Sequence, residues 1–158
     1  MKEFNGMEIL NLLVESEGKV AQLYTDMAGK TDHDKAKNLF MKLAGDELNH
    51  QKMYEALMAD LDQDLKVELE DEDYEYIDSM IRYNYFRTEA VRDKDVKENA
   101  LMVAEKVERD AVMLVQEVME LFPKVAPKEM KKILKEEKKH LKYVLQSQQD
   151  AMVKNLML

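Results

Sequence analysis

Cysteine is absent from the 158-residue sequence, and turn-forming residues are scarce, with four glycines and two prolines. The lack of cysteine excludes disulfides, zinc–thiolate sites, thiol nucleophiles and cysteine-ligated iron–sulfur centres. No apolar run approaches the length of a membrane span, and residues 1–6 carry no signal-peptide pattern. We therefore expect a cytoplasmic protein without a membrane partner.

The residues that are present favour long amphipathic helices. Apolar side chains make up 46% of the sequence and charged side chains 36%, a mixture typical of helical proteins when few turn formers interrupt it. The length suits one compact unit, so residues 1–158 are predicted to form a single domain. The net charge of −9 argues against a nucleic-acid partner.

Apolar residues recur at spacings of three and four in four long segments, which predicts four helices. These helices are expected over residues 7–28, 34–61, 95–122 and 127–156. Gly29 suits the C-terminal cap of the first helix, and Pro127 suits the first turn of the last. The acidic residues 62–73 interrupt the periodicity, and residues 74–86 are expected to form a shorter crossover helix.

The lengths of the connections predict how the helices pair. Short loops join the first helix to the second and the third to the fourth, so each pair should form an antiparallel hairpin. About thirty residues separate the two hairpins, and one such long crossover is the connection found in ferritin-like bundles. The expected fold is an all-α, ferritin-like four-helix bundle made of two helical hairpins.

Charged or titratable residues interrupt the apolar stripe of every long helix where the bundle core should lie. They are Glu17 in the first helix, Glu47 and His50 in the second, Glu108 in the third, and Glu137 and His140 in the fourth. Ionised carboxylates buried alone are costly, so four of them on core faces need compensation. Two divalent cations would supply four positive charges, which predicts a two-metal site inside the bundle.

The spacing within each Glu-x-x-His pair has a chemical reason. Residues three apart on a helix share a face, with Cβ atoms about 5–6 Å apart. The carboxylate can then bridge two metals while the imidazole binds one of them. Iron, manganese and, less selectively, zinc suit such ligands, and two pairs plus one glutamate from each remaining helix match a di-iron or di-manganese carboxylate bundle.

The two halves of the chain repeat this pattern. Glu17 recurs as a glutamate 91 positions later, and Glu47 and His50 both recur 90 positions later. In the same alignment Asp46 falls on Glu136. A duplicated hairpin would place its halves about a pseudo-twofold axis, with the metals near that axis.

Three segments resemble the rubrerythrin branch of the ferritin-like superfamily: residues 17–24, 40–50 and 133–140. The resemblance implies a set of metal ligands, which are Glu17, Glu47, His50, Glu108, Glu137 and His140. It also implies that Glu47 and Glu137 bridge the metals, and no catalytic residue is expected beyond the ligands.

Two positions near the expected site stay open. Rubrerythrins carry two glutamates three apart on the third helix, which Glu105 and Glu108 could match. Glu105 is therefore either a seventh ligand or a polar residue on the flank of the helix. Tyr24 and Tyr54 are expected in the core, where a tyrosine beside a di-iron centre can hydrogen-bond to a ligand.

The resemblance implies a function and its partners. Two iron ions would be the cofactor, with manganese or zinc as possible substitutes, and the reaction would be reduction of peroxide or dioxygen. Full rubrerythrins add a rubredoxin domain with cysteine-bound iron, so this cysteine-free chain would need an external, rubredoxin-like electron donor. Two alternatives are an iron-oxidising storage protein and a metal-stabilised interaction module without turnover. A homo-oligomer is expected, with a dimer favoured.

Overall fold

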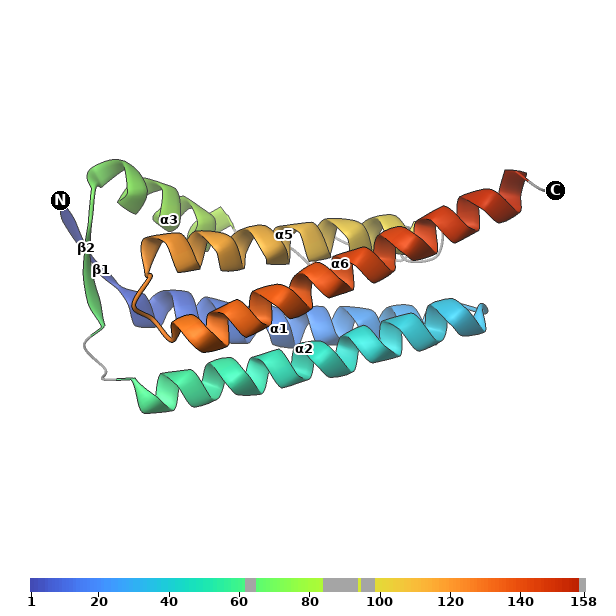
Figure 1. Ribbon diagram of the computed structural model, residues 1–158, viewed down its shortest axis with the longest axis horizontal. Helices are drawn as coiled ribbons and strands as arrows, with labels where there is room; N and C mark the ends of the chain where they lie inside the picture. The colour runs from blue at the N-terminus through green and yellow to red at the C-terminus, as the bar shows by residue number, and fades with distance from the viewer. Residues whose placement is uncertain (62–64, 84–93, 95–98, 157–158) are drawn as a thin grey trace.

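The computed structural model describes residues 1–61, 65–83, 94 and 99–156. Within them, four long helices run side by side along the long axis of the molecule (Figure 1). They are α1 (Gly6–Lys30), α2 (Asp34–Asp60), α5 (Ala100–Leu121) and α6 (Pro127–Leu156). The predicted all-α, ferritin-like bundle is confirmed.

The two hairpins form as the loop lengths predict. Helix α1 packs against α2 and helix α5 against α6 (Figure 1). The four apolar stripes meet in one core. Leu10 and Leu13 of α1, Leu43 of α2, and Ile133 and Val144 of α6 are almost completely buried in that core. The apolar periodicity therefore determines which face of each helix points inward.

The ends of the helices differ from the prediction at several places. Gly29 does not cap α1, because the helix continues through it to Lys30 and its cap is Thr31. At the other end the side chain of Asn5 accepts a hydrogen bond from the backbone N–H of Met7 at 3.0 Å and caps the first turn. Pro127 does begin α6, as expected.

The crossover contains a strand within the acidic residues that interrupt the helical periodicity. Strand β2 (Lys66–Leu69) pairs antiparallel with β1 (Lys2–Asn5), and Phe4 lies opposite Val67 in the register. Phe4 is buried and packs against Phe122, with ring centroids 5.8 Å apart. This two-stranded sheet lies at one end of the bundle (Figure 1).

The crossover helix also begins earlier than predicted. Helix α3 spans Asp71–Tyr83, and the acidic residues 71–73 form its first turn. Negative charge at this end of a helix interacts favourably with the helix dipole, which explains the earlier start. Ile77 and Met80 are buried, as its apolar pattern predicts. Residues 84–86 and 95–98, included in the predicted helices, lie outside the described residues. Among the helices that the structure does describe, none has both the length and the apolar character needed to cross a membrane.

Candidate metal centre

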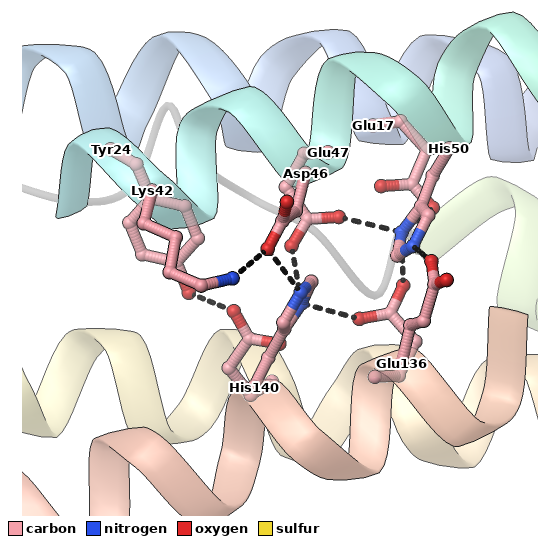
Figure 2. A network of polar contacts seen from close by, with 10 residues as sticks. Glu17, Tyr24, Lys42, Asp46, Glu47, His50, Glu136 and His140 are labelled. Carbon is pink, nitrogen blue, oxygen red and sulfur yellow. Dashed lines mark hydrogen bonds and ion pairs between the residues drawn. The ribbon is translucent and has the colours of Figure 1, made fainter. Parts of the chain in front are cut away.

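Six of the seven candidate ligands lie together inside the bundle, with every long helix contributing at least one (Figure 2). Their side chains are almost fully buried, the most exposed being Glu17 at 7%. They are Glu17 from α1, Glu47 and His50 from α2, Glu108 from α5, and Glu137 and His140 from α6. We call these six residues the carboxylate–histidine cluster.

The cluster divides into two groups of four residues, and in each group the ligand atoms all lie within 4.8 Å of one another. The first group is Glu17, Glu47, His50 and Glu137, and the second is Glu47, Glu108, Glu137 and His140. Glu47 and Glu137 belong to both groups. The arrangement therefore offers two adjacent cation positions that share two carboxylates.

Both histidines turn the same ring nitrogen toward the shared glutamates. Nδ1 of His50 lies 3.1 Å from Oε2 of Glu47 and 3.1 Å from Oε1 of Glu137. Nδ1 of His140 lies 3.1 Å from Oε1 of Glu47 and 3.4 Å from Oε2 of Glu137. The two rings are stacked, with centroids 5.5 Å apart. Nδ1 is thus the nitrogen placed to bind a metal ion in each half of the cluster.

Burial makes the negative charges of the cluster costly. It raises the pKa of Glu17 well above its usual value, and the neighbouring charges of Glu47 and Glu137 raise it further. Burial likewise raises the pKa of Glu108 to about 8, although His140 partly opposes the shift. Without a cation, these two glutamates therefore hold protons far more tightly than ordinary carboxylates.

The histidines compensate for part of this negative charge. Burial alone would lower the pKa of His50, but the carboxylates of Glu137 and Glu47 outweigh it and raise that pKa to about 10. The pKa of His140 is raised even further, against burial, by Glu108, Glu137 and Glu47. Burial would also raise the pKa of Glu47, but the two histidines hold it well below its usual range. The positions next to the shared glutamates are thus strongly favourable for positive charge.

Several buried atoms of the cluster make no hydrogen bond of good geometry within the described residues, although each lies near an atom of opposite charge. They are Oε2 of Glu108, both carboxylate oxygens of Glu137, and Nδ1 of His140. A buried polar atom whose hydrogen-bonding capacity is not used is unfavourable. Metal coordination would satisfy all four atoms, and four carboxylates with two imidazoles are a donor set that iron and manganese accept. The residues present fit a pair of divalent metal ions.

Comparison with known protein families supports the same interpretation. The rubrerythrin family model matches residues 8–146. The chain belongs to the rubrerythrin family. The match includes all six cluster residues, and membership implies iron binding, so the resemblance noted in the sequence is confirmed. No curated protein and no solved structure gave a significant match.

Two tyrosines border the rubrerythrin-type cluster, and both are completely buried, as predicted. The Tyr24 hydroxyl donates a hydrogen bond to Oε1 of Glu108 at 2.5 Å, and the Tyr24 ring stacks on Phe40 with centroids 6.1 Å apart. The Tyr54 hydroxyl has no partner among the described residues. Its pKa is raised by burial and then by the nearby charges of Glu17 and Glu137. The two tyrosines of this rubrerythrin site therefore differ in hydrogen bonding: the Tyr24 hydroxyl is bonded to a cluster residue, and the Tyr54 hydroxyl is not.

Two further carboxylates contact the outward nitrogens of the histidines (Figure 2). Oε2 of Glu136 lies 2.8 Å from Nε2 of His50, and Oδ2 of Asp46 lies 3.2 Å from Nε2 of His140. Neither residue is among the predicted ligands. The sequence feature that could have identified them is their position: each directly precedes a shared glutamate, at equivalent places in the two halves.

Glu105 lies apart from the rubrerythrin cluster and belongs to neither ligand group. Its side chain is partly exposed and accepts hydrogen bonds from Gln148 Nε2 at 2.8 Å and from Arg109 Nε at 2.9 Å. These two contacts lower the pKa of Glu105. Of the two interpretations left open for this residue, the geometry favours a polar residue on the flank of α5.

Proposed function

We propose that this chain binds two iron ions in the carboxylate–histidine cluster and reduces peroxide with electrons from a separate donor protein. The observation that carries the proposal is the pair of buried ligand groups that share Glu47 and Glu137. Membership of the rubrerythrin family favours iron as the metal. Manganese and zinc accept the same kinds of ligand and are the natural substitutes.

Each cluster residue has a distinct role in this proposal. The shared position of Glu47 and Glu137 suits them to bridge the two ions. His50 and His140 each belong to one group only, so each would bind one ion through Nδ1. The four carboxylates balance the four positive charges of two divalent ions, which offsets the burial and the repulsion that together raise the pKa of Glu17.

The surrounding side chains keep bulk water away from the cluster. Leu13 and Ala21 flank Glu17 on α1, while Ile133 and Val144 flank the α6 ligands, and all four are buried. Tyr24 holds Glu108 through its hydroxyl and so restricts the rotation of that carboxylate. When bound, the two ferrous ions supply the two electrons that, with two protons, convert hydrogen peroxide to two water molecules.

The electrons must be replaced after each reaction. The 158 residues contain no cysteine, so they offer no thiolate ligands for an electron-transfer iron of the rubredoxin type. A separate low-potential protein, such as a rubredoxin, is therefore part of the proposal.

The test begins with anaerobic loading of the metal-free protein with ferrous iron. We expect about two ions per chain by metal analysis. Stoichiometric peroxide should give one fast oxidation, and excess peroxide without a donor should then cause no further turnover. Adding reduced rubredoxin should restore peroxide consumption. Absence of retained iron after anaerobic loading would contradict the proposal.

Two glutamate variants provide a matched control. Glu47→Ala removes a carboxylate common to both ligand groups, so it should abolish the binuclear site. Glu105→Ala removes a glutamate outside both groups and should leave two ions bound. If repeated ferrous additions instead load far more than two irons per chain into a large hollow particle, the protein is an iron store and the peroxide reductase proposal is wrong.

A further inference from the structure

We propose that Asp46 and Glu136 are positioning residues, each of which orients the metal-binding histidine on the opposite hairpin and fixes its tautomer. This inference rests on the proposed two-metal site. It assigns a role to two carboxylates that are not themselves in either ligand group.

The contacts are reciprocal between the two hairpins. Glu136 on α6 reaches across to Nε2 of His50 on α2, at 2.8 Å, and Asp46 on α2 reaches across to Nε2 of His140 on α6, at 3.2 Å (Figure 2). Each of the two carboxylates directly precedes a shared glutamate in the sequence. The same two-residue unit thus contributes one metal ligand and one partner for a histidine.

The contacts determine which nitrogen is free to bind a metal ion. A neutral imidazole has one N–H donor and one nitrogen with a free lone pair. An ionised carboxylate only accepts hydrogen bonds, so its contact with Nε2 requires the proton to be there. The lone pair is then on Nδ1, which is the nitrogen that faces the cluster in both His50 and His140. A carboxylate on the outer nitrogen also makes a histidine a stronger metal ligand.

The burial of the four side chains fits this division of roles. The side chains of His50 and His140 are 0% and 3% exposed, whereas those of Glu136 and Asp46 are 40% and 33% exposed. Each contact thus joins a buried histidine to a carboxylate that keeps contact with solvent. Asp46 is itself held by Lys42, whose Nζ lies 2.5 Å from Oδ2.

Each positioning residue should act on one metal ion only. His50 belongs to the first ligand group and His140 to the second, so loss of Glu136 should weaken the first position and loss of Asp46 the second. A merely structural link between α2 and α6 would behave differently, because its loss would loosen both positions together. The distribution of the effect between the two ions therefore separates the two roles.

The experiment uses Asp46→Ala, Asp46→Asn, Glu136→Ala and Glu136→Gln. Asp110→Asn is the matched control, because Asp110 pairs with Lys106 four residues before it, at 2.8 Å, as Asp46 pairs with Lys42, but contacts neither histidine. Each metal-free protein is titrated anaerobically with Co²⁺, followed by calorimetry and by the visible absorption of the bound ion. Thermal unfolding of the metal-free proteins reports any general structural damage.

We expect the wild-type protein to bind two Co²⁺ ions. Asp110→Asn should bind both ions as tightly as the wild-type protein does. Each alanine variant should bind one of its two ions about 10–100-fold more weakly and the other normally, with an altered visible spectrum for the weakened ion. The amide variants should recover part of this loss, since the amide oxygen still accepts a hydrogen bond from Nε2–H. In the Zn²⁺-loaded wild-type protein, ¹⁵N spectra should show protonated Nε2 in both cluster histidines.

Three results would overturn the inference. Equal weakening of both ions in either alanine variant would show a structural link only. Alanine variants that bind metal as tightly as Asp110→Asn would show that the carboxylates have no role, while the two-ion proposal would stand. A wild-type protein that binds no Co²⁺ and no Fe²⁺ would overturn both proposals.

Discussion

The two buried tyrosines beside the cluster should respond in opposite directions when each loses its hydroxyl group. The Tyr24 hydroxyl donates to Glu108 at 2.5 Å inside the core, so Tyr24→Phe leaves a buried acceptor with one partner fewer. Such a loss costs about 1–3 kcal/mol. We expect the free energy of unfolding of the metal-free protein to fall by this amount.

The Tyr54 hydroxyl is just as buried, but it has no hydrogen-bond partner within the described residues. Tyr54→Phe removes a polar atom whose unpaired burial is itself unfavourable, and it keeps the ring that packs in the core. Stability should therefore stay the same or rise, by at most about 3 kcal/mol. The contrast depends on one hydrogen bond, because the two substitutions are chemically identical.

Urea unfolding in the presence of a chelator, followed by circular dichroism, measures both variants against the wild-type protein. Thermal unfolding gives a second readout, in which 1 kcal/mol corresponds to a shift in Tm of about 2–4 °C for a chain of this size. Equal destabilisation by the two substitutions would refute the reasoning, and so would a larger loss for Tyr54→Phe.

Three further predictions concern stability. The metal-free protein should become less stable as the pH rises from about 4.5 to about 10. Folding raises the pKa of Glu108 from 4.5 to about 8 and that of His50 from 6.5 to about 10, so the folded state binds more protons than the unfolded chain over this range. Melting curves at several pH values test this, and a rising profile would contradict it. Chelation of the metal should lower Tm modestly, since the histidines neutralise part of the buried negative charge that metal removal leaves behind, and equal Tm values with and without metal would contradict this. Gly45→Ala should raise the free energy of unfolding by about 1 kcal/mol, because a Cβ on this exposed helical residue meets no atom within 4 Å; an unchanged Tm would count against this.

The main features of the bundle and cluster were accessible from the sequence because they depend on helical periodicity. Glu17, Glu47 and Glu108 interrupt apolar stripes, and a residue on such a stripe faces the core wherever the helix ends. The repeat of Glu-x-x-His in the second half of the chain then placed two equivalent faces opposite each other. Both signals extend over many residues, so small errors in helix boundaries did not affect them.

Other features depended on contacts that a one-dimensional pattern does not contain. Asp46 and Glu136 find their histidines on another helix, so their role follows from how the hairpins cross and not from their own spacing. Strand β2 has only four residues, too few for its alternation to stand out from an acidic segment, and its partner lies at the start of the chain. Gly29 resembled a helix end because glycine favours that position, but the helix continues through it.

The small sheet has a consequence for the order in which the chain assembles. Strand β1 directly precedes α1 and β2 follows α2, so the pairing of the two helices brings both strands to the same end of the bundle (Figure 1). The ladder between Lys2 and Leu69 then closes with little additional loss of loop entropy. Both strands and both helices of the first hairpin are therefore synthesised before any residue of α5 or α6. The first hairpin carries three of the six cluster residues, and the second hairpin supplies the other three.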